Sequence, residues 1–264
     1  MEQISAGDFL NKAIAIPQCC KVINGIMERY DVHLGVNSVV VVINCPDEQC
    51  TTVIDNIKHG MRKFYPEKFD DDTLIKVEKF YNMRLFGGLF LPKIKTYESL
   101  LPAAHHVPVK KDGKLMILNL SHIGYDNNTK EFGLFVRYGH DSATASCGAI
   151  SSCYDIIVKG SKMPSDTDLR ALSKYIKQTV SLHNIQQQPS GYDLLEVTLK
   201  AYSGQAPWVK QQLTKLAKKD NLSIIYIGGI EIDTNKEHDI DTHDKIVLID
   251  KFIVGQNGNI TDIS

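Results

Sequence analysis

The sequence predicts an α/β fold with a mixed, mostly parallel sheet flanked by helices. Continuous apolar, β-branched runs such as Ser38–Asn44 (SVVVVIN) are typical of strands that are buried on both faces, as in parallel sheets. These runs alternate with stretches of helical periodicity from one end of the chain to the other. The length of 264 residues and the hydrophobic content of 43% suit one core, so we expect a single domain over residues 1–264.

The strand predicted at Ser38–Asn44 leads directly into a predicted amphipathic helix. Apolar residues recur at helical spacing from Cys50 to Phe64, and Pro46 and Asp47 suit the first turn of that helix. Cys45 is therefore expected at the carboxyl end of a buried strand. Open α/β sheets place their ligand sites at such strand ends.

The middle of the chain predicts a hairpin with chemically interesting residues around it. Its strands are expected at Lys114–Leu120 (KLMILNL) and Phe132–Arg137 (FGLFVR), and the turn at Asp126–Asn128. His122 then lies just beyond the first strand. Cys147 lies near the start of a helix that follows the second strand.

The C-terminal half predicts three helices and two strands. The helices are expected at Ser165–His183, Asp193–Tyr202 and Pro207–Lys219, with Ser165 and Asp168 in capping positions of the first. A Gln-rich segment at 186–191 is expected to be a loop between helices. The strands are expected at Leu222–Ile232 and Lys245–Val254.

Composition argues against several classes of function. Lys and Arg number 30 and Asp and Glu number 31, which gives a formal net charge of −1. Such a balance lacks the excess of positive charge that is typical of proteins that bind nucleic acid or an anionic membrane surface. No apolar run approaches the roughly 20 residues of a membrane span. The N-terminus lacks the pattern of a signal or transit peptide, so we expect a cytoplasmic protein.

Three residues form a candidate metal site. The six cysteines are too few to build a dense disulfide framework in a chain of this length, so they are core, metal-binding or catalytic residues. Cys45, His122 and Cys147 each lie near the end of a predicted core strand, where their side chains can meet. Two thiolates and an imidazole suit Zn²⁺, and three protein ligands leave a fourth position for water, as in catalytic zinc sites. Taken singly, Cys45 is as well explained by packing as by chemistry, whereas a backbone hydrogen bond for His122 and packing for Cys147 are the better explanations.

Two further segments have both a chemical and a structural explanation. His140 with Asp141 suits a proton relay near Cys147, or a cap for the next element. The stretch KEHDIDTHDK at 236–245 is rich in metal-binding residue types. Its acids lack the ordered spacing of a calcium loop, so we expect a solvated loop there.

Three segments of the chain resemble the limiting-CO2-inducible protein B/C family, also called the theta class of carbonic anhydrases. They are HHVPVKKDGKLMILNLSHIGYD at 105–126, RYGHDSATASCGA at 137–149 and IIYIGGIEIDT at 224–234, in that order. The resemblance covers most of the chain. It implies a fold similar to beta-class carbonic anhydrases, a homodimer or higher homo-oligomer, and zinc held by Cys, His and Cys.

The resemblance assigns the zinc ligands to positions that the residues themselves indicate. The first ligand falls on Cys45 in its C-x-D motif, the second on His122 in H-I-G and the third on Cys147 in C-G-A. The acid of the C-x-D motif is Asp47, which is placed to accept a hydrogen bond from the attacking water.

One position departs from the beta-class pattern C-x-D-x-R. Gln49 stands where that pattern has arginine. Asp47 needs a cation to orient its carboxylate, and we expect Arg84 or Arg137 to supply it and to line the substrate site.

The expected activity is the zinc-dependent reversible hydration of CO2 to bicarbonate, with His140 returning the proton to solvent. Because Gln49 replaces the arginine, a catalytically weak relative that acts as a carbon-metabolism scaffold or sensor is the alternative. A thiol hydrolase with Cys147 as nucleophile is a further alternative, and metal content distinguishes it from the other two.

Overall fold

The computed structural model describes residues 5–34, 36–47, 49–61, 80–91, 96–108, 112–137, 139–158, 160–179, 192–235 and 244–264. In chain order its elements are α1 (Ala6–Asn11), β1 (Ile14–Ala15), α2 (Ile16–Arg29), β2 (Ser38–Asn44), α3 (Gln49–Gly60), β3 (Phe80–Arg84), the 3₁₀ turn η2 (Phe86–Gly88), α5 (Thr96–His105), β4 (Lys114–Asp126), β5 (Glu131–Phe132), β6 (Leu134–Val136), β7 (Ala143–Ala145), α6 (Gly148–Val158), α7 (Thr167–Thr179), α9 (Tyr192–Asp220), β8 (Ser223–Thr234), β9 (Lys245–Val254) and β10 (Ile260–Asp262).

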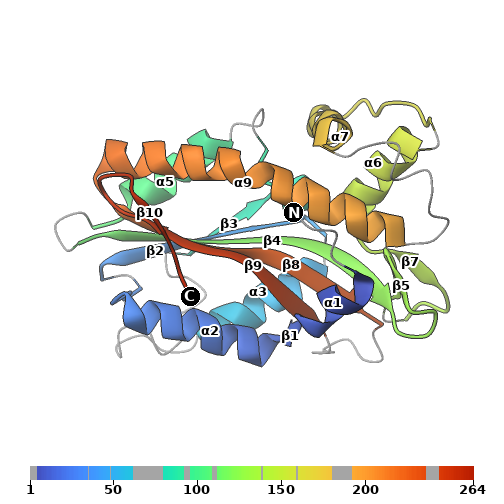
Figure 1. The fold of residues 1–264 in the computed structure, drawn as a ribbon, viewed down its shortest axis with the longest axis horizontal. Helices are drawn as coiled ribbons and strands as arrows, with labels where there is room; N and C mark the ends of the chain where they lie inside the picture. Colours follow the sequence, from blue (N-terminus) through green and yellow to red (C-terminus); the bar gives the residue numbers. More distant parts are fainter. Residues whose placement is uncertain are drawn as a thin grey trace.

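The main sheet is mixed, with a parallel centre, as the sequence predicts. Its strand order is β1-β9-β8-β4-β2-β3. Strands β3, β2, β4 and β8 are parallel, whereas β9 runs antiparallel to β8 and pairs with β1 and β10 at the edge. Helices α5 and α9 cover one face and α2 and α3 the other, while α6 and α7 lie on the same side as α9 and pack against it (Figure 1).

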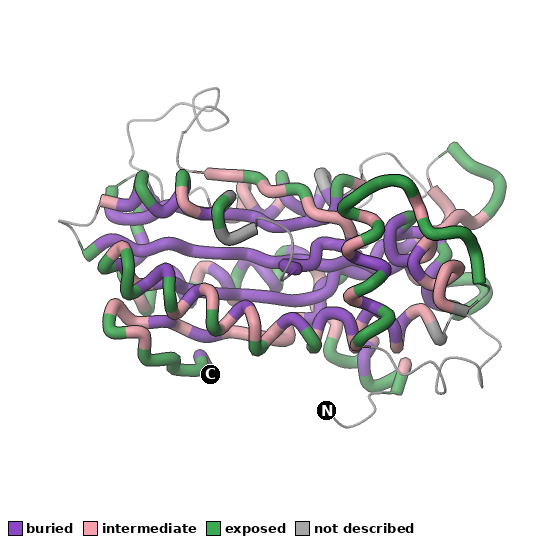
Figure 2. The backbone as a smooth tube through the Cα atoms, turned by 90° about the horizontal axis from the view of Figure 1, so that it is seen from above, coloured by how far each residue is buried: buried purple, intermediate pink, exposed green. Residues whose placement is uncertain are grey.

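The apolar runs of the central strands form strands because a helix layer lies on both faces of the sheet there. All seven residues of β2 are buried, and the central strands form a continuous buried band (Figure 2). Val40 and Val42 enter the core beneath α2 and α3, whereas Val39 and Val41 enter the core beneath α5 and α9. In a strand with two buried faces, side chains on both faces enter the apolar core. The sequence of such a strand is therefore a continuous apolar run without alternating polar residues.

The two helices predicted at Asp193–Tyr202 and Pro207–Lys219 are in fact one helix, α9, with Pro207 inside it. A proline in a helix interior removes one backbone hydrogen bond and costs about 3 kcal/mol. Tyr202 before the proline and Val209 after it are both buried in the core. The burial of both halves against the same sheet offsets the cost of the proline.

The predicted hairpin is also arranged differently. Strand β4 runs on to Asp126, so His122 lies within the strand rather than beyond it. The second predicted strand is split at Gly133, whose φ is +95°, into β5, which pairs with β4, and β6, which pairs with β7 in a separate small sheet. Only a glycine adopts such a φ readily, so the chain leaves the main sheet at this point.

Two predicted helix starts move by a residue or more. Helix α3 begins at Gln49, so Pro46 and Asp47 precede it. Helix α7 is capped by Asp166 and not by Ser165, because the Asp166 carboxylate accepts hydrogen bonds from the N–H groups of Asp168 and Leu169.

The Gln-rich segment predicted to be a loop lies outside the described residues. Within the described part of the chain, no helix is both long enough and apolar enough to span a membrane.

Candidate metal centre

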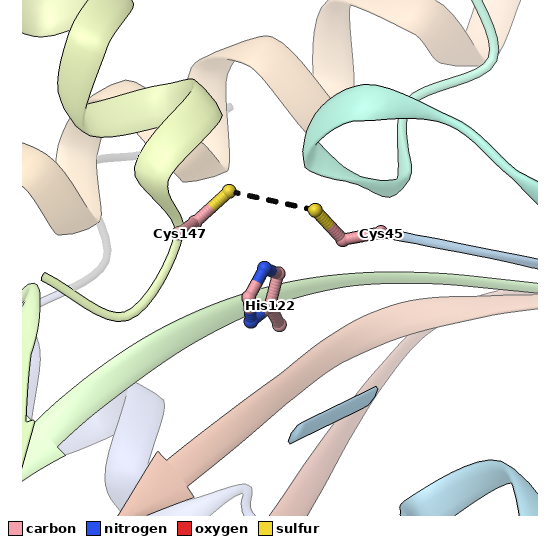
Figure 3. Close-up of side chains that lie close together, drawn as sticks. All are labelled: Cys45, His122 and Cys147. Carbon is pink, nitrogen blue, oxygen red and sulfur yellow. Dashed lines mark hydrogen bonds between the residues drawn. The ribbon is translucent and has the colours of Figure 1, made fainter. Parts of the chain in front are cut away.

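Cys45, His122 and Cys147 meet at the carboxyl ends of the parallel strands (Figure 3). Their potential ligand atoms all lie within 4.8 Å of one another, and the two Sγ atoms are 3.9 Å apart. All three side chains are buried, His122 completely. The convergence that the sequence predicts is therefore present, and the three residues form a group that can hold a metal ion.

The register of the sheet brings Cys45 to His122. The last registered pair between β2 and β4 joins Ile43 to Asn119. Two residues further along each strand, Cys45 comes level with Ser121, directly beside His122. Strand β2 ends at Asn44 whereas β4 continues to Asp126, so the turn after β2 lies beside β4 near His122.

Cys147 is held in place by the residue that precedes it. The Ser146 hydroxyl accepts a hydrogen bond from the backbone N–H of Gly124, two residues after His122, and the Ser146 N–H donates to the Gly133 carbonyl at 3.1 Å. Cys147 itself stands at the start of α6, where its Sγ accepts a hydrogen bond from the Ile150 N–H at 3.5 Å. The positive end of a helix favours a thiolate, so this placement suits a metal ligand.

The donor geometry fits a tetrahedral ion. Two thiolates at about 2.3 Å from a tetrahedral metal lie roughly 3.8 Å apart, close to the observed Sγ–Sγ distance of 3.9 Å. The Nδ1 atom of His122 is hydrogen-bonded to Asp233 Oδ2 at 2.8 Å. The other ring nitrogen, Nε2, is buried and has no hydrogen-bond partner in the described structure. A buried ring nitrogen without a partner is costly unless it binds something, so Nε2 is the available donor.

The electrostatics of the cluster favour a single negative charge shared by the two cysteines. A hydrogen bond from the Cys147 thiol, together with nearby His122, lowers the pKa of Cys45 to about 4. Donating that hydrogen bond, and burial, hold the pKa of Cys147 well above its usual value. Burial lowers the pKa of His122, but the electrostatic influence of the neighbouring Cys50, Cys147 and Asp233 outweighs burial and raises the pKa well above its usual value.

A carboxylate and a guanidinium lie beside this cluster. Arg137 donates from Nη1 to Asp47 Oδ1 and from Nη2 to Asp47 Oδ2, each at 3.3 Å. The Arg137 Nε also donates to Thr144 Oγ1 at 3.1 Å, and Nη2 donates to the carbonyls of Ala145 and Ser146. The arginine thus ties the C-x-D turn to the strand that leads into Cys147.

The other two predicted site residues, Arg84 and His140, are exposed, whereas the three potential ligands are buried. Arg84 is exposed at the end of β3, whereas the part-buried Arg137 donates to both oxygens of Asp47. His140 is exposed in the turn between β6 and β7, where its N–H donates to the Arg137 carbonyl at 3.0 Å. Among the described residues, no side-chain hydrogen bond joins His140 to the three potential ligands.

Sequence reasoning missed the buried acids behind His122. Glu231, Asp233 and Asp244 are almost completely buried, and their carboxylate oxygens lie within 4.8 Å of one another. Asp244 was expected in a solvated loop, and that expectation is wrong, because its Oδ1 accepts from the Thr234 N–H and it packs beside β8. The available signal was the pair of acids in IEIDT, within a strand that is otherwise apolar.

The surroundings of the cluster are apolar and closely packed. Leu89, Ile123 and Ile150 belong to the same buried cluster as both cysteines. Gly88 has a φ of +63°, and a Cβ there would overlap the Leu120 carbonyl oxygen of β4. Glycine is therefore required where η2 crosses β4 next to the site.

A sequence comparison identifies the family. Residues 97–247 match the profile of the limiting CO2-inducible proteins B/C beta carbonic anhydrases. The chain belongs to this family. The match includes His122, Arg137, Cys147 and Asp233, whereas Cys45 and Asp47 precede it. No curated protein sequence matches the chain.

Solved structures of two LCIB proteins have the same fold as this family member. PtLCIB4, a homologue of the limiting CO2-inducible protein LCIB, superposes with a TM-score of 0.72 at 16% identity, covering 96% of this chain and 95% of that one. LCIB itself superposes with a TM-score of 0.58 at 14% identity, covering 99% of each chain. At these identities the likeness speaks for the fold alone.

Proposed function

We propose that this protein catalyses the zinc-dependent reversible hydration of CO2 to bicarbonate. The observation that carries the proposal is the convergence of Cys45, His122 and Cys147, with an unpartnered imidazole nitrogen, in a member of a carbonic anhydrase family. Two sulfur donors and one nitrogen donor favour Zn²⁺ over the harder ions that prefer oxygen ligands.

Zn²⁺ bound by these three residues would lower the pKa of a water molecule in the fourth position toward neutrality, so that hydroxide is available at physiological pH. Every other contribution comes from the chain. Asp47 is an acceptor beside the cluster, able to take a hydrogen bond from the attacking oxygen and so aim its lone pair at the carbon. Arg137 holds both oxygens of that carboxylate and thereby fixes its orientation.

The apolar wall supports CO2 as the substrate. Leu89, Ile123 and Ile150 belong to the same buried cluster as the cysteines and offer no hydrogen bonds from their side chains. A small linear molecule without a net charge or dipole is compatible with such a wall, whereas a charged substrate would lose its hydration there. His140 is exposed on the hairpin that carries Arg137, and we keep it as the proposed route by which the proton returns to solvent.

The test is to measure metal content and the rate of CO2 hydration on the same sample. Cys147→Ser should lose both zinc and activity. Cys153→Ser is the matched control, because Cys153 is equally buried in α6 but its Sγ contacts Ser173 Oγ at 3.2 Å instead of the cluster. Zinc content of Cys147→Ser equal to that of the control would refute the ligand set.

The same experiment separates the alternatives. A wild-type protein that holds zinc but does not hydrate CO2 is the scaffold or sensor, the alternative that Gln49 in place of arginine favours. A wild-type protein without zinc whose hydrolase activity is lost in Cys147→Ser is the thiol hydrolase. A homodimer and a cytoplasmic location stay predictions.

A further inference from the structure

We propose that Asp233 is a positioning residue for the metal centre, which sets the tautomer and orientation of His122 so that Nε2 faces the metal. The inference rests on the proposed metal site, and it assigns a role to a residue that neither the C-x-D motif nor the three ligands include. Carboxylate partners of this kind commonly orient a ligating histidine and raise its basicity.

The pairing of β4 with β8 places the two side chains on one face. His122 lies opposite Glu231 and Gly124 lies opposite Asp233 in the parallel register. Residues two apart on a strand share a face, so His122, Glu231 and Asp233 all project to the same side of the sheet. From there Asp233 Oδ2 lies 2.8 Å from His122 Nδ1, and both side chains are completely buried.

The chemistry of this contact decides which nitrogen is protonated. A carboxylate only accepts hydrogen bonds, so Nδ1 has to carry the proton that it donates to Asp233. The lone pair of the neutral ring is then on Nε2, which is buried without a partner in the described structure. A flip of the ring would place a carbon against the carboxylate, which would leave Asp233 Oδ2 without its partner. The hydrogen bond therefore fixes both the tautomer and the direction of the ring.

The chain offers a matched control for this single contact. Glu231 lies on the same strand as Asp233, is equally buried and has a carboxylate within 4.8 Å of the Asp233 carboxylate. No hydrogen bond joins Glu231 to the His122 ring within the described residues. Asp233→Asn and Glu231→Gln thus both replace a buried carboxyl group by an amide at the same depth, but only Asp233→Asn alters the partner of Nδ1.

The first test compares the affinities of both variants for zinc, by competition with a chromophoric chelator. Asp233→Asn should bind zinc about 10- to 100-fold more weakly than the wild type, and Glu231→Gln should stay close to the wild-type affinity. The absorption bands of the Co²⁺-loaded protein should shift in Asp233→Asn only, because the ring geometry changes. Equal affinities in Asp233→Asn and the wild type, or equal losses in both variants, would overturn the proposal.

A second test needs no variant and so remains decisive if Asp233→Asn does not fold. In the zinc-loaded wild-type protein, ¹⁵N resonances of His122 should report a protonated, hydrogen-bonded Nδ1 and a metal-bound Nε2. A metal-bound Nδ1, or a proton on Nε2, would overturn the proposal. Both tests read metal binding and not turnover. A protein with the expected affinities and resonances but no CO2 hydration would thus refute the proposed activity and leave the role of Asp233 standing.

Discussion

Arg137 donates hydrogen bonds to both carboxylate oxygens of Asp47, although the two residues are 90 positions apart in the chain. The beta-class pattern places its arginine two residues after the acid, where this chain has Gln49. Here the guanidinium comes from the β6–β7 hairpin and is itself held by Thr144 Oγ1 and by two backbone carbonyls. A second element of the fold thus supplies the cation that the motif lacks, which argues against treating Gln49 as a sign of lost activity.

Replacing Arg137 tests whether this pair serves the reaction. Arg137→Ala should retain zinc but lower kcat by about 10- to 100-fold, because the Asp47 carboxylate loses the two donors that orient it. Arg137→Lys should recover only part of the rate of CO2 hydration, since an ammonium group cannot form the bidentate hydrogen bonds that a guanidinium forms with a carboxylate. Stopped-flow CO2 hydration with parallel metal analysis gives both numbers.

A double-mutant cycle is the control for that experiment. If Arg137 acts through Asp47, the double variant Asp47→Ala with Arg137→Ala should be no slower than the slower single variant. Additive losses would show that the arginine acts independently of the acid, for instance by contacting the substrate directly.

The turn that crosses β4 beside the site should tolerate no side chain at Gly88. Gly88→Ala would combine a positive φ with an overlap onto the Leu120 carbonyl oxygen, and it should destabilise the fold by about 2 kcal/mol or more. Gly25→Ala is the control, because Gly25 lies within α2 and a Cβ there meets nothing within 4 Å. That variant should gain up to about 1 kcal/mol from helix propensity, and denaturant unfolding measures both. Equal stability of the two variants would contradict the packing described for η2.

The sequence predicted the strands and the three potential ligands because both depend on local pattern. The β-branched run of β2 requires two buried faces, and Cys45 follows it directly, so its position at the strand end needs no tertiary information. The bounds of β9 at Lys245–Val254 were likewise readable from an apolar run. Cysteine and histidine near successive strand ends indicated a common site, since parallel strands end at one edge.

What the sequence could not supply depends on contacts between distant elements. Pro207 ordinarily ends a helix, and only the sheet beneath α9 shows why it does not do so here. The partner of Asp47 was open between two arginines until the β6–β7 hairpin was placed. The acids of β8 lie in an otherwise apolar run, but that run does not show what they contact, because their contact with His122 comes from the register between β4 and β8.

Zinc should contribute directly to the stability of the fold. The centre joins the end of β2, the carboxyl-terminal half of β4 and the start of α6, so an ion bound there links three elements. At a free zinc concentration 1,000 times the Kd, the stabilisation is about 4 kcal/mol. Adding zinc to chelator-treated protein should raise Tm progressively, and the same addition to Cys147→Ser should not. Cys153→Ser should respond like the wild type, and a loss of the response in that variant would mean that the shift does not report this site.

The affinity for zinc should rise with pH, and the shifted pKa values of the ligands determine the slope. The pKa values of Cys147 and His122 are raised, so in the metal-free protein both carry a proton at neutral pH that binding has to displace. The pKa of Cys45 is lowered to about 4, so this thiol is already ionised and releases nothing. Below both raised values, the release of two protons should increase the affinity about 100-fold per pH unit.

Competition with a chelator of known protonation, measured between pH 6 and pH 8 (roughly the range of an ordinary histidine), tests this slope. A flat profile would mean that both ligands are already deprotonated, and a slope near tenfold per unit would mean that only one of them carries a displaceable proton.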